Sequence, residues 1–507
     1  MDLPPSAPRF MSFIPHIRQS AICIFFTAGL AVLFGSNSVA RGDELLRAAE
    51  TLQAKYAADI KQLAAWCEEK GLKEQARQTL AALGPQNPLK FYVPILPVDV
   101  APAKLPDGAS PEMIQWDNRL KGLQREQANA LYDLARRAVR SQHAALALQL
   151  ALEAVVANPD NEPLRRLLGY QKYQNQWRTL FEVQKLRAGM VWHDKFGWLP
   201  QAHVRRYEDG QRYYEGKWIS SEEDAKLHSD IRSGWDIETE HYSIRTNHSL
   251  QAGAALAVKL ESLYRLWQQM FIRYCYSETD VISLFDGRSR NQHPAAIRHQ
   301  VVYFRDREDY NRSLRAALPN IEISVGTYLD SMRIAYFFAD KQSDDRTIYH
   351  EATHQLFHES REVASTVGRR WNFWIIEGIA MYMESLRKEN GYYVLGGADD
   401  ERMLAARYRL LNDHFHVPLE QLSDIGMEKF QKDPKIATLY SQSAGLMHFL
   451  VHYDHGRYRD ALVAYITTVY TGQDGPETLS QLTGATYSDL DKQYHQFMEQ
   501  AGLNSRQ

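Results

Sequence analysis

The most constraining feature of the sequence is the segment Tyr349-His350-Glu351-Ala352-Thr353-His354. Serine and aspartate at 343–345 are candidate N-caps, and no glycine or proline follows until Gly368, so the pattern predicts a helix. Two histidines four residues apart lie on one face of a helix, where they can bind one zinc ion. Glu351 lies beside the first histidine and can accept a proton from a water held by the metal. The five-residue pattern alone leaves open a helix whose histidines are only packed or solvated.

A second helix is predicted over residues 371–384 (WNFWIIEGIAMYME), which are mostly apolar but include Glu377. A carboxylate in such a run is costly to bury without a partner. Gly378 costs about 1 kcal/mol relative to alanine in a helix, which indicates a close contact at that position. A zinc ion bound by Glu377 together with both histidines accounts for these features. The alternative is a carboxylate at the helix margin, paired with an arginine.

These two segments, HEATH and WIIEGIAMYME, resemble the paired helices of the gluzincin metallopeptidases, in their peptidase-MA-like branch. The resemblance implies that His350, His354 and Glu377 are the ligands of one Zn²⁺ and that Glu351 is the general base. The second helix of that group usually reads NEGxAxY, so Ile376 stands where asparagine is common. This replacement removes a hydrogen bond but no ligand.

More closely, the region from Tyr207 to Phe497 is similar to a family of exported bacterial proteins of undetermined role. In gluzincin aminopeptidases a tyrosine ahead of a small-residue helix stabilises the oxyanion, and the segment from Tyr440 to Leu446 (YSQSAGL) resembles that pattern. We therefore expect Tyr440 to be catalytic; the alternative is a tyrosine at a helix start with its hydroxyl in water. Those aminopeptidases carry Gly-x-Met-Glu-Asn where this chain has Ser324–Asp330, without the Glu-Asn pair. Aminopeptidase specificity is therefore not expected.

Two further side chains continue the helix faces that carry the candidate ligands. His358 extends the row of His350 and His354, but three such histidines span about 12 Å and cannot all bind one zinc. We expect His358 outside the coordination sphere. Glu384 follows Glu377 by two helical turns, and two interpretations are open: it orients a ligand histidine, or it is a solvated carboxylate at the helix end.

The start of the chain predicts export. An apolar run from Ala21 to Gly35 follows basic residues and precedes Ser38-Val39-Ala40, which is typical of a signal peptide over residues 1–40. Fifteen apolar residues are fewer than the ~20 needed to span a bilayer, so we expect cleavage after Ala40; the alternative is an uncleaved membrane anchor. We expect a periplasmic or extracellular protein without a transmembrane helix in its mature chain. Cys67 and Cys275 are expected to be free, buried thiols.

The 507 residues predict several folding units, which we place at 41–190, 191–235 and 236–505. The first is predicted to be an all-α domain in which residues 130–171 resemble a tetratricopeptide helix pair, with a proline-rich linker at 92–115. The second is an aromatic, turn-rich connector in which Asp209-Gly210 is a candidate hairpin turn.

The region 236–505 is predicted to be a gluzincin-like α+β domain, with a small sheet followed by a mostly helical lobe. Helix is expected over 251–273 and nearly everywhere after 344, apart from loops near 391–397 and 415–435. Alternating or β-branched runs predict strands at 241–246, 281–285, 300–304 and 332–338.

Together these features predict an exported zinc metallopeptidase that acts on a peptide or protein substrate. A net charge of −3, from 59 basic and 62 acidic residues, argues against a nucleic-acid partner. The alternative is a catalytically silent gluzincin-fold binding or scaffold protein of the cell envelope, with a protein partner on the N-terminal helices. Hydrolysis of a non-peptide amide is a third interpretation.

Overall fold

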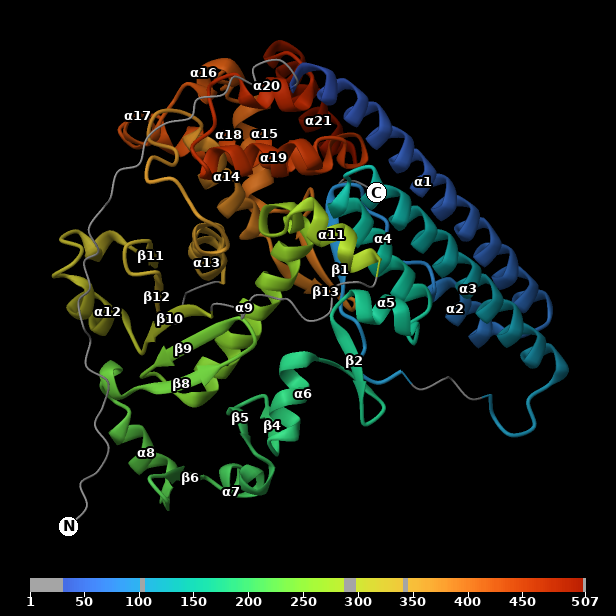
Figure 1. The fold of residues 1–507 in the computed structure, drawn as a ribbon, viewed down its shortest axis with the longest axis horizontal. Helices are drawn as coiled ribbons and strands as arrows, with labels where there is room; N and C mark the ends of the chain where they lie inside the picture. The colour runs from blue at the N-terminus through green and yellow to red at the C-terminus, as the bar shows by residue number, and fades with distance from the viewer. Residues whose placement is uncertain (1–30, 101–104, 287–297, 341–344, 505–507) are drawn as a thin grey trace.

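The computed structural model describes residues 31–100, 105–286, 298–340 and 345–504 (Figure 1). The predicted signal peptide falls mainly on residues 1–30, which lie outside the described residues, and 31–40 form the start of helix α1 (Ala31–Glu69). Within the described ranges, none of the helices combines the length and apolar character needed to cross a membrane. Cys67 is buried and Cys275 half-buried, and both are free thiols.

The N-terminal region is built from long helices that lie side by side (Figure 1). Helix α3 (Pro111–Arg140) begins with a proline in its first turn, and the Ser110 hydroxyl accepts a hydrogen bond from the Met113 backbone N–H. Leucines and alanines on α3 pack against those of α4 (Ala144–Ala157), so the predicted helix pair is present. The flanking helices are α2 (Lys73–Ala81) and α5 (Glu162–Leu167).

The prediction that residues 41–190 are wholly helical is wrong. Strand β1 (Lys90–Pro94), which overlaps the start of the proline-rich segment, pairs antiparallel with β14 (Tyr392–Gly396), about 300 residues later in the chain. Phe91 and Val93 of β1 are buried in the main core of the C-terminal region. A sequence pattern cannot reveal this strand readily, because its hydrogen-bonding partner is so distant in sequence.

Residues 169–228 form three copies of one unit, a two-stranded hairpin followed by a short helix, that sequence reasoning did not identify. Each copy opens on a glycine with positive φ and carries a tryptophan in its second strand. The glycines are Gly169, Gly189 and Gly210, and the tryptophans Trp177, Trp198 and Trp218. The copies comprise β2 (Tyr170–Tyr173), β3 (Gln176–Thr179) and α6 (Leu180–Arg187); β4 (Met190–His193), β5 (Gly197–Pro200) and α7 (Val204–Glu208); and β6 (Gln211–Tyr214), β7 (Lys217–Ser220) and α8 (Ser221–Leu227).

Each unit packs on the next through an aromatic ring. Phe181 of α6 contacts Trp198, and Tyr207 of α7 contacts Trp218, both edge to face. After α8, His228 stacks on Trp235, the first residue of the main sheet. The three units therefore form a short linear array that ends on this sheet.

The hairpin predicted at Asp209-Gly210 is wrong, because these residues end α7 and open β6. The turn of that hairpin lies at Glu215-Gly216, where both residues have positive φ, as a two-residue type I′ turn requires.

The central sheet has the strand order β11-β12-β10-β9-β8. Strands β9, β10 and β12 are parallel, and the two outer strands, β8 and β11, run antiparallel to their neighbours. Side chains alternate between its faces: Phe337 points into the main core, whereas Tyr336 and Phe338 pack with helix α12 (Arg307–Leu314) on the other face. The strands are β8 (Trp235–Glu238), β9 (Tyr242–Thr246), β10 (His299–Phe304), β11 (Thr327–Leu329) and β12 (Ile334–Phe338).

Helix α9 (Leu250–Met270) packs against β8 and β9, in agreement with the predicted helix at 251–273, and is followed by α10 (Ile272–Cys275). The strand predicted at 281–285 is wrong, because these residues belong to helix α11 (Glu278–Phe285). Ser277 and Asp280 form a capping box at its start, a local signal that outweighs a short apolar run.

The C-terminal lobe is mostly helical (Figure 1). Together with the central sheet, it makes the chain a mixed α+β protein. The loop predicted near 391–397 is instead the hairpin of β13 (Arg387–Glu389) and β14, and the segment 415–435 contains two short helices. The helices are α13 (Arg346–Glu359), α14 (Phe373–Met383), α15 (Glu401–Leu411), α16 (Leu419–Ser423), α17 (Met427–Gln431), α18 (Ile436–His452), α19 (Arg459–Tyr470), α20 (Thr478–Thr483) and α21 (Tyr487–Asn504).

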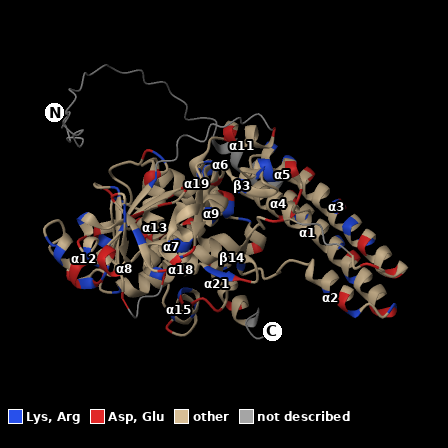
Figure 2. Cartoon of the chain, turned by 90° about the horizontal axis from the view of Figure 1, so that it is seen from below, with Lys and Arg blue, Asp and Glu red and all other residues tan. Residues whose placement is uncertain are grey.

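Acidic and basic residues are intermixed along the helices, as Figure 2 shows. The N-terminal helices are fixed to the C-terminal lobe partly by such groups. His143, just before α4, pairs with Asp460 of α19, and Arg459 donates a hydrogen bond to the Gln149 side chain.

Candidate metal centre

Helices α13 and α14 pack against each other and bring three candidate ligands together. His350 and His354 lie one turn apart on α13, with their Nε2 atoms 3.2 Å apart. The carboxylate of Glu377, on α14, lies 3.5 Å from His350 Nε2 and 3.8 Å from His354 Nε2. In the described part of the chain, these residues form the one group of three metal-binding side chains whose ligand atoms all lie within 4.8 Å of one another.

These separations fit a tetrahedral zinc ion. Bonds of about 2.1 Å at tetrahedral angles place two ligand atoms about 3.4 Å apart, close to the three observed distances. The side chains are 14–18% exposed, so they are largely shielded from solvent but still accessible. Two imidazoles and one carboxylate are a common donor set for catalytic zinc and leave a position for water or substrate.

Glu384 accepts a hydrogen bond from His350. Its Oε1 atom lies 2.8 Å from His350 Nδ1, and its side chain is only 5% exposed. Of the two interpretations that the sequence left open for Glu384, the structure favours orientation of a ligand histidine. With Nδ1 donating to this carboxylate, Nε2 faces His354 and Glu377, and its lone pair becomes available to a metal ion when the Nε2 proton is released.

The electrostatics of the site favour a positive charge between the carboxylates. Burial acts to lower the pKa of His350, but the hydrogen bonds with Glu377 and Glu384 outweigh it and raise the pKa to about 10. Burial lowers the pKa of His354 to about 4, despite the nearby carboxylate of Glu377. Burial also acts to raise the pKa of Glu377, but its contacts with the two histidines hold the pKa below its usual value. A divalent cation would supply this positive charge.

Glu351 lies next to the ligands and is held by the main sheet. Its Oε2 atom accepts a hydrogen bond of 2.9 Å from the backbone N–H of Tyr328, on β11. Burial, with a further contribution from the charge of Glu377, raises the pKa of Glu351 to about 7. A carboxylate with such a pKa can both accept and release a proton near neutral pH.

A glycine allows strand β11 to approach α13. A Cβ atom at Gly326 would lie 2.7 Å from Thr347 Cγ2 and 3.6 Å from Glu351 Cγ. The segment Ser324–Asp330, which lacks the Glu-Asn pair of the aminopeptidases, therefore lies directly against the candidate general base.

A second close contact lies at Gly378, as the sequence predicts. A Cβ atom there would lie 2.9 Å from Met447 Cγ and 3.0 Å from the Ser443 carbonyl oxygen, both on α18. Tyr440 lies on the same helix, with its ring edge to face on Phe430. Burial raises its pKa, and the charges of Glu377 and Glu351 add to that effect, so Tyr440 is electrostatically coupled to the site.

His358 does not join the ligands, in agreement with the length of the helical row. Its ring is packed between those of Tyr328 and Tyr470, at centroid distances of 5.7 and 5.4 Å. Tyr470 is buried, and within the described residues its hydroxyl has no hydrogen-bond partner. Sequence reasoning gave no indication of Tyr470, because it follows a run of ordinary helix residues.

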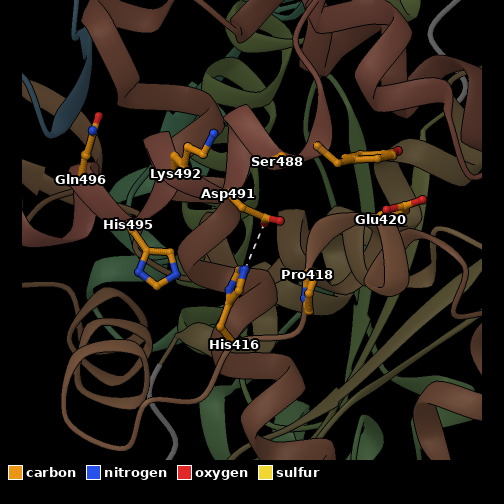
Figure 3. A pocket seen from close by; sticks show the side chains of 9 residues that line it. His416, Pro418, Glu420, Ser488, Asp491, Lys492, His495 and Gln496 are labelled. Atoms are coloured by element: carbon orange, nitrogen blue, oxygen red, sulfur yellow. Dashed lines mark hydrogen bonds and ion pairs between the residues drawn. The ribbon is translucent and has the colours of Figure 1, made fainter.

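A separate surface cavity of about 560 Å³ lies between α16 and α21 (Figure 3). In its lining, His416 Nε2 contacts Asp491 Oδ1 at 3.1 Å. The Asp491 carboxylate also accepts the backbone N–H of Leu419, so it holds the start of α16. None of the residues that line this cavity belongs to the metal centre.

One family model matches part of this chain. It covers residues 344–473 and describes a protein of unknown function, DUF1570. The matched stretch contains the HEATH helix, Glu377, Glu384 and Tyr440. No curated protein matches the chain significantly.

Proposed function

We propose that this protein is an exported zinc-dependent metallopeptidase of the gluzincin type. The observation that carries the proposal is the convergence of His350 Nε2, His354 Nε2 and the Glu377 carboxylate within 3.2–3.8 Å. The adjacent Glu351 supplies the proton acceptor that hydrolysis requires. We extend the proposal to export on the strength of the apolar segment between residues 21 and 35.

When bound, zinc supplies a Lewis acid that makes a water more acidic and polarises a carbonyl group. Glu351 accepts the proton of the water that attacks the scissile carbonyl, then donates it to the leaving amine. Its hydrogen bond from the Tyr328 N–H fixes one carboxylate oxygen and leaves the other free for this transfer. The Tyr440 hydroxyl donates a hydrogen bond to the oxygen that becomes negatively charged.

The proposed substrate is an extended peptide that lies along β11. This strand is an outer strand of the sheet and pairs only with β12 among the described strands. Because the Tyr328 N–H points to Glu351 and away from β12, the unpaired side of β11 faces the general base. An unpaired strand can form backbone hydrogen bonds with an extended segment. Since Ser324–Asp330 lacks the Glu-Asn pair whose glutamate would bind a free amine, we propose internal cleavage.

The chemistry around β11 favours apolar substrate side chains. Ile323 is 86% exposed, Val325 57% and Met332 54%, and these three residues flank the strand on both sides. Exposed apolar side chains on the segments that flank β11 support a preference for apolar substrate groups.

The test is digestion of a diverse peptide library with purified protein, with and without a chelator. We expect cleavage that the chelator abolishes and that added zinc restores. Glu351→Gln should abolish cleavage while zinc stays bound. Zinc binding without cleavage of any peptide would instead support the binding or scaffold alternative, and turnover by Glu351→Gln would reject the role of Glu351.

A further inference from the structure

The start of α15 contacts helices α18 and α13 and the end of α14, all in the C-terminal lobe, through consecutive side chains. Asp400, the N-cap residue, lies 3.2 Å from His448 Nε2 on α18. Glu401 pairs with Arg346 at the start of α13. Arg402 pairs with Glu384, directly after α14.

The contact between Arg402 and Glu384 is bidentate. Arg402 Nε donates to Glu384 Oε2 at 2.8 Å, and Arg402 Nη2 donates to Oε1 at 3.0 Å. Because Oε1 also accepts from His350 Nδ1, both oxygens of this carboxylate are occupied. The planar guanidinium thus fixes the orientation of the carboxylate that holds the histidine.

We propose that Arg402 is a positioning residue of the metal centre, acting through Glu384 on the His350 ring. The inference rests on the proposed zinc site. Arg402 itself is 42% exposed and touches none of the three ligands. Its effect comes from the burial of Glu384, whose side chain is 5% exposed and has Arg402 as its cationic partner.

Loss of Arg402 would leave a buried carboxylate with one partner instead of two. Such a carboxylate can rotate about its last torsion angle, and its hydrogen bond with His350 Nδ1 then no longer has one fixed direction. The imidazole would lose the orientation that directs Nε2 towards His354 and Glu377. Outer hydrogen-bond partners of this kind commonly change metal affinity about 10–100-fold when they are removed.

The experiment measures zinc affinity of the full chain by competition with a chromophoric chelator. We expect Arg402→Ala to weaken zinc binding about 10–100-fold. Arg402→Lys keeps the charge but not the bidentate geometry and should recover only part of the affinity. The matched control is Arg409→Ala, on the same helix, which removes an exposed ion pair with Asp413. This control should bind zinc as the wild type does.

Two further readouts separate positioning from a general loss of structure. The visible absorption spectrum of the cobalt-substituted protein should change in Arg402→Ala and not in Arg409→Ala, since it reports the ligand geometry. In the double variant Arg402→Ala/Glu384→Gln, affinity should fall no further than in Glu384→Gln alone. Additive losses, or wild-type affinity with an unchanged cobalt spectrum in Arg402→Ala, would overturn the inference. Failure of the wild type to bind zinc would instead reject the proposed function.

Discussion

The backbone N–H of Tyr328 and the side chain of Glu351 are joined by a hydrogen bond of 2.9 Å between strand β11 and helix α13. This bond links the outer strand of the sheet to the candidate general base. It depends on the close approach of β11 to α13, which a side chain at residue 326 would prevent.

Gly326→Ala should therefore impair catalysis more than it impairs zinc binding. Its Cβ would lie 2.7 Å from Thr347 Cγ2, so β11 must move away from Glu351. We expect a loss of about 1–3 kcal/mol in stability, typical of overpacking, together with lower turnover. Thermal unfolding measures the stability, peptide cleavage the turnover, and chelator competition the zinc affinity. Gly122→Ala, where a Cβ meets nothing within 4 Å, is the control; equal effects of both substitutions would contradict the account.

Gly378→Ala should weaken zinc binding and stability, although alanine is favoured by about 1 kcal/mol inside a helix. The new Cβ would lie 3.0 Å from the Ser443 carbonyl oxygen and would push α14 away from α18. Because Glu377 precedes this position, its carboxylate would shift relative to the two histidines. Chelator competition measures the affinity, and an unchanged affinity combined with higher stability would refute the argument.

Tyr440→Phe should reduce kcat about 100-fold while KM and zinc affinity change little, as expected for a group that acts only on the developing oxyanion. Steady-state kinetics on a cleaved library peptide would measure this. Tyr408→Phe, at a tyrosine that is 57% exposed, should behave as the wild type. Retention of full kcat in Tyr440→Phe would leave Tyr440 without a catalytic role.

Acid should weaken the attachment of α9 to the central sheet. The Glu261 carboxylate accepts hydrogen bonds of 2.8 Å from the backbone N–H and from Nδ1 of His241. Burial acts to raise the pKa of Glu261, but these bonds outweigh it and lower the pKa from 4.5 to about 2. The pair therefore stabilises the fold fully above about pH 4.5, and this contribution is lost as the pH falls towards 2.

Unfolding by urea at several pH values, for the wild type and for Glu261→Gln, isolates this contribution. The difference in free energy of unfolding should be on the order of 3 kcal/mol near pH 6 and should shrink below pH 4. Glu308→Gln, at a side chain that is 89% exposed, should follow the wild type at every pH. A difference between Glu261→Gln and wild type that is independent of pH would contradict the assignment.

The convergence of the three candidate ligands could be predicted from sequence because its information is local. Helical spacing alone places His350 beside His354, and an acid in an apolar helix marks Glu377. The two interpretations of Glu384 could not be decided in this way, because its partner Arg402 approaches from a different helix. Likewise, no pattern indicates that the Tyr328 N–H points to Glu351.

The errors in the fold have physical causes of two kinds. Strands β1 and β14 are stabilised by each other across most of the chain, so neither can be recognised from its own sequence. The apolar run at 281–285 is too short to distinguish helix from strand by periodicity. The three hairpin–helix units, in contrast, have a local sequence signal: Gly169, Gly189 and Gly210 are each followed eight or nine residues later by a tryptophan, in the second strand of the hairpin.

The central claim is that His350, His354 and Glu377 together bind one zinc ion. The most direct test is elemental analysis of the purified full-length protein after removal of metal by a chelator, return of zinc and dialysis. We predict one zinc per wild-type chain and loss of tightly bound zinc in His350→Ala, His354→Ala and Glu377→Ala. A wild-type chain that retains no zinc, or a Glu377→Ala chain that retains it as tightly, would contradict the account.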